Sequence, residues 1–252
     1  MATATTDDYS TKDKSVDLGS GVEMEFVCIP GGSFLMGSEK GHANEKPVHP
    51  VTLTKPFYLG KYEVTQEQWQ AVMGNDHSLF KAARNPVDYA SWDDCQQFLA
   101  RLNKKLSGWK ASLPTEAQWE FACRAGSSTR FYYGDDEAKL AEYAWYAANA
   151  GGSTHPVGQK KPNAWGLYDM IGNVWEWCSD WYGSYRADTQ ENPQGPRSGL
   201  SRVLRGGAFD IVGAGLSSSR RSGLMPGGHC NCYGLRIALL VVGTARQLGL
   251  QK

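Results

Sequence analysis

The sequence lacks the features that define several large classes of protein. Its longest apolar run, residues 237–242, is far shorter than the roughly 18 residues of a membrane-spanning helix. Lysine and arginine together number 26, as do aspartate and glutamate, so the chain has no net charge. This balance argues against a nucleic-acid-binding protein or a polybasic membrane-surface protein. The motifs GxSxG and HExxH, the P-loop and the dinucleotide-binding glycine fingerprint are also absent.

The first 20 residues contain no hydrophobic stretch of the signal-peptide type. They are rich in Thr, Asp, Lys and Ser, which have too little apolar surface to offset the entropy of ordering, so we predict a flexible tail. Residues 244–252 are predicted to be a second tail, and residues 21–243 a single domain, expected to be a monomer. Two locations stay open: the cytoplasm, or outside it if an export signal has been removed.

Six cysteines are scattered along the chain. Cys95 and Cys123 fall on the apolar faces of predicted helices, where a free thiol behaves as a small hydrophobic side chain. Cys230-Asn231-Cys232 is too tightly spaced for the usual two-residue metal knuckle. We therefore expect free thiols and no metal–thiolate site.

Three capping boxes, which begin at Thr65, Ser91 and Thr115, predict three helices with apolar stripes. Residues 33–37 follow a Gly-Gly pair and are expected to form a hairpin with the strand before it. From residue 131 to 233 the chain consists mostly of short segments broken by Gly, Pro and Asn, with aromatic side chains that can anchor loops. Apolar or alternating stretches predict strands at residues 25–30, 51–54, 57–59, 174–177, 201–204 and 235–242.

The most specific polar pattern is Gly-Leu-Tyr-Asp-Met-Ile-Gly-Asn-Val-Trp-Glu-Trp at residues 166–177. Its carboxylates at Asp169 and Glu176 flank a glycine turn, and with intervening carbonyl oxygens they could enclose a hard cation such as calcium. The alternative is a buried turn in which both carboxylates accept hydrogen bonds from backbone N–H groups. The residues alone leave both interpretations open.

Six short motifs occur in a fixed order along the chain: PGGSFLMG at 30–37, YEVT at 62–65, NPV at 85–87, LPTEAQWE at 113–120, GNVWEW at 172–177 and RGG at 205–207. In this order and spacing, the chain resembles the sulfatase-modifying-factor family, the formylglycine-generating enzymes and their relatives. The resemblance implies an irregular α+β fold of C-type-lectin-like topology, with short antiparallel strands, few helices and long loops. It also implies a structural calcium site, and no other cofactor is required. The implied ligands are Asp169, Glu176 and the backbone carbonyl groups of Met170, Gly172 and Val174.

The catalytic residues of the family do not carry over. Formylglycine-generating enzymes use two cysteines shortly after the Gly-Gly that matches residues 206–207, and this chain has Ile211 and Leu216 at those positions. Without thiolates there is neither a copper ligand nor thiol redox chemistry. The sequence therefore predicts no catalytic residue. The alternative is an oxidoreductase of this family with shifted ligands, or a degenerate enzyme.

The segment 208–233 departs from the family in a patterned way. Many bacterial relatives have Asn-rich runs here, and nearly all of the replacements differ from an Asn codon at one or two adenines. This pattern resembles the variable proteins of diversity-generating retroelements, which scramble template adenines in a C-terminal cassette on this fold. The resemblance implies a non-catalytic, receptor- or adhesin-like protein at the cell surface or outside the cell. Ordinary drift in a dead enzyme is the alternative.

The diversified side chains are expected to form one exposed surface that binds an unidentified protein or cell-surface ligand. Arg221, Pro226 and Arg236 are expected to fix the backbone around it. The predicted surface consists of Ala208, Phe209, Asp210, Ile211, Val212, Arg220, Ser222, Gly223, Leu224, Gly228, His229, Cys230, Asn231, Cys232 and Tyr233.

Overall fold

A computed structural model describes residues 13–241 of the chain. The predicted C-terminal tail, 244–252, and residues 1–12 of the N-terminal one lie outside the described residues. The tail prediction is wrong for residues 14–19, which form strand β1 (Lys14–Gly19) and pair antiparallel with β2 (Val22–Ile29). The reason is an alternation that the polar composition conceals: Val16 and Leu18 point inward and pack against the core.

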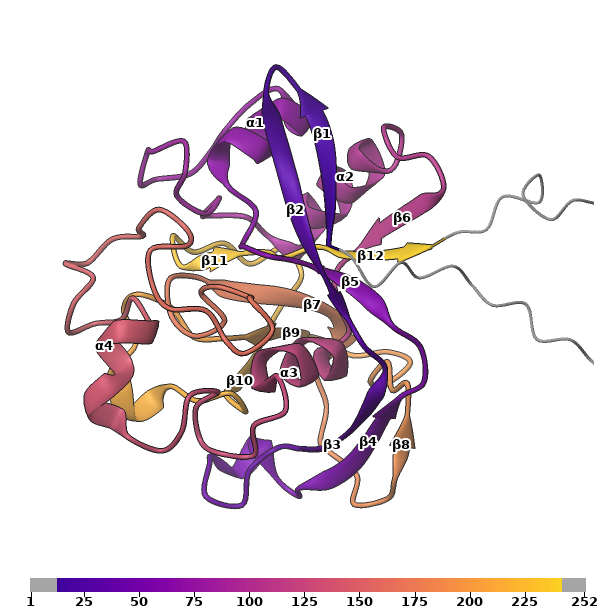
Figure 1. Ribbon diagram of the computed structural model, residues 1–252, viewed down its shortest axis with the longest axis vertical. Helices are drawn as coiled ribbons and strands as arrows, with labels where there is room; N and C mark the ends of the chain where they lie inside the picture. Colours follow the sequence, from indigo (N-terminus) through magenta and orange to yellow (C-terminus); the bar gives the residue numbers. More distant parts are fainter. Residues whose placement is uncertain (1–12, 242–252) are drawn as a thin grey trace, which may run out of the picture.

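A five-stranded sheet runs through the upper half of the molecule in Figure 1, in the order β1-β2-β5-β12-β6. Its remaining strands are β5 (Phe57–Gly60), β12 (Ala238–Val241) and β6 (Trp109–Ser112). Strand β12 lies between β5 and β6, so the first and the last described segments of the chain belong to the same sheet. Helix α1 contacts β1 and β2, and α2 contacts α1 and β6.

The three predicted helices are present, and each begins at its predicted capping box. They are α1 (Gln66–Met73), α2 (Trp92–Leu102) and α3 (Glu116–Arg124). Their N-cap side chains accept a hydrogen bond from the backbone N–H three residues later, as the motif requires. A fourth helix, α4 (Leu140–Tyr143), is a single turn. Short 3₁₀ turns occur at Ala43–Glu45, Glu137–Lys139 and Gly213–Gly215.

Two smaller sheets complete the strands. One has the order β10-β9-β7-β11, formed by β10 (Arg221–Leu224), β9 (Arg202–Arg205), β7 (Trp175–Trp181) and β11 (Tyr233–Gly234). The other has the order β3-β4-β8, formed by β3 (Gly32–Met36), β4 (His49–Leu53) and β8 (Gln190–Glu191). Two of their pairings, β11 with β7 and β4 with β8, are parallel.

The predicted hairpin of residues 25–37 is wrong in its pairing. Both segments are strands, but β2 pairs with β1 and β5, whereas β3 pairs with β4. The Gly-Gly connection carries the chain from one sheet into the next instead of turning it back. Pairing partners depend on distant segments, which local composition does not encode.

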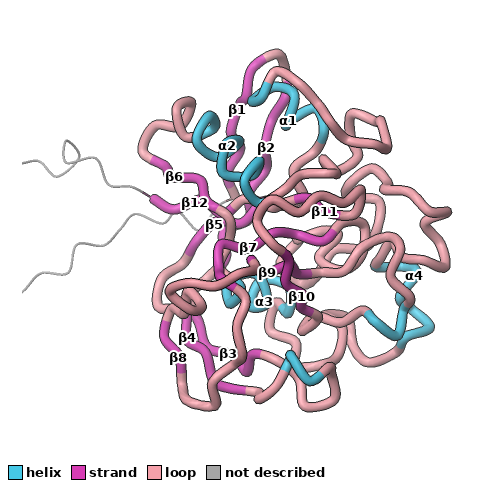
Figure 2. Tube along the Cα trace, turned by 180° about the vertical axis from the view of Figure 1, so that it is seen from behind, coloured by secondary structure: helices cyan, strands magenta, loops and turns pink. Residues whose placement is uncertain are grey.

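Long irregular segments dominate the rest of the fold, as Figure 2 shows. Residues 144–174 contain neither helix nor strand. Buried aromatic residues occur along these segments. The core itself consists of two clusters, in which Trp119 on α3 and Trp177 on β7 are fully buried. The predicted fold class, an irregular α+β domain with short strands, few helices and long loops, is confirmed. Among the described residues no helix is long and apolar enough to cross a membrane.

Candidate ligand-binding surface

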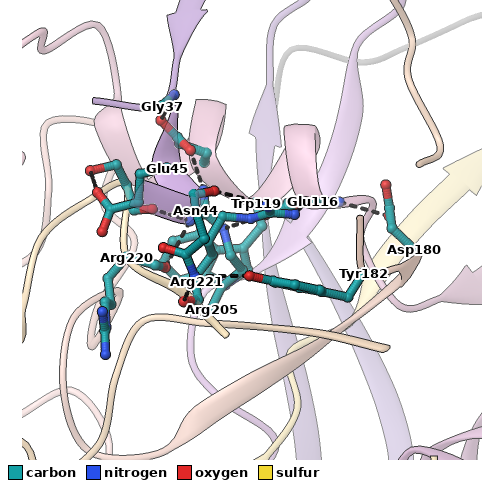
Figure 3. A network of polar contacts seen from close by, with 12 residues as sticks. Gly37, Asn44, Glu45, Glu116, Trp119, Asp180, Tyr182, Arg205, Arg220 and Arg221 are labelled. Carbon is teal, nitrogen blue, oxygen red and sulfur yellow. Dashed lines mark hydrogen bonds and ion pairs between the residues drawn. The ribbon is translucent and has the colours of Figure 1, made fainter. Parts of the chain in front are cut away.

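A buried set of charged residues on α3, β9 and β10 holds the backbone beneath the predicted surface (Figure 3). We call Glu116, Glu120, Arg205 and Arg221 the inner network. Arg205 pairs with Glu120, and its Nη1 donates to the carbonyl oxygens of residues 219 and 220 at 2.6 and 2.7 Å. Arg221 binds both carboxylate oxygens of Glu116, at 2.7 and 2.8 Å. The backbone therefore depends on buried groups and not on exposed side chains.

Electrostatics keeps Glu120 charged within the inner network. Burial alone would raise the pKa of Glu120, but the guanidinium groups of Arg205 and Arg124 outweigh it and hold that pKa below its ordinary value. Buried charges of this kind cost free energy unless they are paired and hydrogen-bonded, which these are.

The three predicted braces are confirmed as structural anchors. Arg221 belongs to the inner network, and the carbonyl oxygen of Pro226 accepts a hydrogen bond from the backbone N–H of Trp92 at 2.9 Å. Arg236 is fully buried, where it pairs with Glu176 at 2.7 Å and donates to the carbonyl oxygen of Gly60 at 2.9 Å. Together they connect the C-terminal segment to α2, α3 and the large sheet.

The residues expected to hold calcium do not fit that role. Both carboxylate oxygens of Glu176 accept hydrogen bonds from Arg236, and one also accepts from the indole N–H of Trp119 at 2.6 Å. One oxygen of Asp169 accepts from the backbone N–H of Gly158 at 2.7 Å, while the other has no partner. A cation beside Glu176 would face a fixed guanidinium charge. The hydrogen-bonded turn is the better description, with an arginine in addition.

The other groups expected to hold calcium are buried in the same turn. Burial raises the pKa of Asp169 to about 6, although the N–H of Gly158 and the charge of Arg236 act against it. The carbonyl oxygen of Met170 accepts a hydrogen bond from the thiol of Cys123 at 3.8 Å. Gly172 and Val174 are buried in the same turn. No group of three or more metal-ligating side chains occurs among residues 13–241.

The predicted surface residues differ in their exposure. Phe209 is buried, packs edge-on against Phe80 at 5.4 Å between ring centroids, and its backbone N–H donates to Asn173. Ala208 and Cys232 are buried as well, so the surface prediction is wrong for these three residues, which belong to the core beneath the surface. The exposed residues are Asp210, Val212 and His229; the half-buried ones are Ile211, Arg220, Ser222, Gly223, Leu224, Gly228, Cys230, Asn231 and Tyr233; the buried ones are Ala208, Phe209 and Cys232.

Tyr233 lies where two of the predicted stretches meet. It is in parallel register with Trp175 on β7, and its ring contacts that of Trp177 at 5.7 Å between centroids. Burial raises the pKa of Tyr233, and the nearby carboxylate of Asp210 raises it further. Residues 208–212 and 230–233 are therefore neighbours in space.

The stretch 228–230 is placed by α2 and the loop before it. The backbone N–H of Tyr89 donates to the carbonyl oxygen of Cys230 at 3.0 Å, and the Tyr89 and His229 rings lie 5.2 Å apart. The Nε2 atom of His229 lies 3.1 Å from a carboxylate oxygen of Asp94 on α2.

Strand β10 divides its residues between the interior and the surface. Arg221 points inward to Glu116, and a Cβ on Gly223 would lie 2.6 Å from Cγ of Tyr182. Successive side chains of a strand alternate, so Ser222 and Leu224 face the opposite way. Gly223 has no room for a side chain and cannot be a diversified position.

A Cβ on Gly228 would lie 2.5 Å from the end of the Leu224 side chain and 3.1 Å from the Met225 carbonyl oxygen, so a side chain there requires Leu224 to move. We define the binding surface as the exposed and half-buried predicted residues without these two glycines. It consists of Asp210, Ile211, Val212, Arg220, Ser222, Leu224, His229, Cys230, Asn231 and Tyr233.

Sequence reasoning missed three exposed apolar side chains that adjoin the binding surface. Tyr89 stacks on His229 and is 40% exposed, Leu79 precedes the Phe80 that packs on Phe209, and Met225 follows Leu224. The side chains of Leu79 and Met225 are 59% and 66% exposed, which is close to the 65% exposure of the predicted Val212. Met225 could have been found because it lies within the variable segment. Leu79 and Tyr89 lie far upstream, where no local signal exists.

Cys230 and Cys232 form a disulfide, which corrects the expectation of free thiols at these two positions. The tight spacing that argues against a metal knuckle does not prevent a disulfide between the two side chains. The other four cysteines are free, and three of them are buried. Burial raises the pKa of Cys123 to about 12, so its thiol is not a nucleophile at neutral pH.

One of the two positions of the family cysteines, Leu216, lines a separate groove. The groove has a volume of about 1130 Å³ and runs between residues 33–48, 124–130 and 214–219. Leu216 is buried and lines it, and Ile211 is half-buried nearby. Gly207, at φ +80°, packs so closely on Leu216 that a Cβ would lie 2.2 Å from its side chain. No cysteine lines this groove.

Comparison with known proteins places this geometry in a family. The sulfatase-modifying factor enzyme 1-like domain matches residues 19–240. Among solved structures, Treponema denticola variable protein 1 superimposes with a TM-score of 0.84 and 32% identity, over 90% of this chain and 98% of that one. The mouse formylglycine-generating enzyme is 31% identical over 71% of this chain and 49% of its own length.

The protein belongs to the sulfatase-modifying-factor family. Within it, the chain is structurally similar to a variable protein as well as similar in sequence to formylglycine-generating enzymes. It is also 32% identical to the serine/threonine-protein kinase pkn1 of Chlamydia pneumoniae, over 85% of this chain. The chain spans only 38% of the length of that kinase.

Proposed function

We propose that this protein binds a ligand without catalysis, through a binding surface that a retroelement diversifies. One observation carries the proposal. Arg205 holds the carbonyl oxygens of residues 219 and 220, and Glu116 holds Arg221, while the Arg220 side chain lies beside Trp175 and the Ser222 side chain faces the opposite side of β10 from Arg221. Such a segment tolerates many side chains because its conformation does not depend on them.

The composition of the surface suits recognition of a protein. Tyr233 and Tyr89 supply rigid aromatic area, whereas Ser222 and Asn231 supply adaptable polar contacts, which is the mixture found in antibody paratopes. Val212 and Met225 add two exposed apolar side chains to this segment, at 65% and 66% exposure.

The alternative is an oxidoreductase of the formylglycine-generating type. It requires a pair of reactive thiols in a cleft, but the groove at Leu216 has no cysteine and the thiol pKa values of Cys123 and Cys178 are raised by burial. Incubation with copper and a Cys-Thr-Pro-Ser-Arg peptide tests this. We expect no aldehyde, and aldehyde formation would contradict a purely binding role.

The disulfide supports a location outside the cytoplasm. Disulfides persist in oxidising compartments and are rare in reducing ones, and Cys230 and Cys232 lie within the binding segment. We therefore propose that the surface is displayed where oxidants keep this bond closed.

The diversification is tested in the DNA. We expect a near-copy of the sequence that encodes residues 208–233, beside a reverse-transcriptase gene and differing from it only at adenines. The differences should fall at positions of the binding surface and spare the codons of Gly223, Arg221 and Phe209. Differences spread evenly over buried and exposed positions would favour drift in a dead enzyme.

A further inference from the structure

Arg220 differs from the other arginines of the C-terminal segment. Arg205, Arg221 and Arg236 each form a buried ion pair with a glutamate. Among the described residues the Arg220 guanidinium donates no hydrogen bond and forms no ion pair, and its buried Nε has no acceptor. Figure 3 shows its side chain leaving the inner network.

The backbone of Arg220 is nevertheless firmly placed. Its carbonyl oxygen accepts a hydrogen bond from Arg205 at 2.7 Å, and its N–H donates to the carbonyl oxygen of Ser217 at 3.2 Å. Its side chain lies next to Trp175, with 5.9 Å between the guanidinium carbon and the ring centroid. Trp175 is in register with Tyr233, so the guanidinium stands beside the centre of the binding surface.

The buried Nε–H of Arg220 is costly to leave without an acceptor. Burying a hydrogen-bond donor without a partner costs about 1–3 kcal/mol, and more for a charged group. The Asp210 carboxylate on the same surface acts on Tyr233 but forms no ion pair with Arg220. The planar fork of an arginine matches a carboxylate, which can accept two parallel hydrogen bonds from it.

We infer that Arg220 anchors the ligand by binding the carboxylate of an aspartate or glutamate side chain on a partner protein. The inference rests on the proposed function and names the chemistry that the surface recognises. The acidic side chain is flanked by an aromatic or apolar residue in the partner, because Trp175 lies beside the guanidinium, Tyr233 is in register with Trp175, and Leu224 faces the same side of β10 as Ser222. Desolvation by these neighbours strengthens the ion pair.

Blocked dipeptides test the anchor directly. Acetyl-Trp-Glu-amide is titrated into the full chain, and the Nε–Hε signal of Arg220 and the backbone signals of Ser222 and Tyr233 are followed by NMR. We expect saturable shifts in the millimolar range. Acetyl-Trp-Gln-amide, which lacks the charge, should bind roughly tenfold more weakly, because hydrogen bonds to charged groups are the stronger ones. Acetyl-Trp-Gln with a free C-terminus shows whether a terminal carboxylate can replace the glutamate side chain as the group that Arg220 binds.

Variants complete the test. Arg220→Gln should abolish the difference between the acidic and the amide peptide, and Arg220→Lys should restore only part of it because it lacks the fork. Arg186→Gln is the matched control, since Arg186 is exposed and pairs with Asp188 away from the surface. Thermal unfolding confirms that each variant is folded, and partial rescue by lysine separates anchoring from a structural defect.

Three outcomes overturn the inference. Equal affinity for the acidic and the amide peptide, with shifts at Tyr233, shows a binding surface in which Arg220 is no anchor, and the proposed function then stands alone. Stronger binding of the free C-terminus than of the glutamate side chain shows that Arg220 recognises a terminal carboxylate and not an acidic side chain. No saturable shift with any peptide shows that the guanidinium recognises none of these groups. Aldehyde formation in the copper assay, by contrast, refutes the proposed function itself.

Discussion

Arg220 and Arg221 are adjacent in the sequence but belong to regions with opposite physical roles. Arg221 lies in the inner network, paired with Glu116 and surrounded by buried groups. Arg220 lies on the binding surface, where its guanidinium forms no hydrogen bond or ion pair with any residue between 13 and 241. Arg221 is the first residue of β10 and Arg220 immediately precedes that strand, so one side chain enters the inner network while the other lies beside Trp175.

The comparison predicts its largest effect for the inner network. Glu116→Gln leaves Arg221 without its carboxylate, and breaking a buried pair costs about 3–5 kcal/mol. Urea unfolding should show a loss of that size. Asp210→Asn, a matched change on the binding surface, should alter the free energy of unfolding by no more than about 0.5 kcal/mol. Similar losses in the two variants would remove the distinction between the regions.

A second effect concerns Asp180, which touches the inner network. Burial, followed by the charge of Glu116, raises the pKa of Asp180 to about 7 from an ordinary 3.8. Between these values the unfolded carboxyl loses its proton while the folded one retains it, so stability falls as pH rises through this window and the loss is complete above it.

Asp180→Asn keeps the acceptor for the Glu116 N–H, 2.8 Å away, and removes the titration. We therefore expect the variant to gain melting temperature over the parent at pH 8, with a much smaller difference at pH 4. A constant difference across pH would show that Asp180 does not titrate in this range.

The disulfide of the binding surface should have an intermediate effect. Closing so short a loop contributes about 1–2 kcal/mol by chain entropy. Replacing Cys230 and Cys232 together by serine should lower the unfolding free energy by that amount and shift the NMR signals of Tyr89 and His229, which contact this stretch. Signals of the inner network should stay in place; if they move, the two regions are not independent.

Exchanging exposed residues of the binding surface should affect stability little and binding strongly. Serine at Asp210, Val212, His229 and Asn231 together should cost less than about 2 kcal/mol, at most about 0.5 kcal/mol each. The same variant should lose binding to whatever protein ligand the parent binds, measured by calorimetry. Retained binding would place the site elsewhere on the molecule.

The smallest effect is expected for chelation. Because Arg236 already neutralises Glu176, EDTA should leave the melting temperature unchanged. A drop of several degrees that added calcium reverses would restore the calcium interpretation, since a ligand that binds only the folded state stabilises it by mass action.

Local patterns in the sequence were sufficient for the helices and for the family. Thr65, Ser91 and Thr115 begin their helices as predicted, because a capping box is satisfied within four residues. Strand pairing was not predictable in the same way: residues 25–37 contain two strands that join different sheets. The strand at 14–19 was missed because its apolar residues are few and only their partners make them buried.

The candidate site divides along the same line. The sequence predicted its location in the segment 208–233 and its braces Arg221, Pro226 and Arg236, because the departure from the family pattern and the family-like residues around it can be read along the chain. The burial of Phe209, the constraint at Gly223 and the contribution of Tyr89 were decided only by the tertiary structure. So was the ion pair that replaces calcium at Glu176. Each of these depends on which distant side chain comes into contact, and the free energy of such contacts arises only when the whole chain has folded.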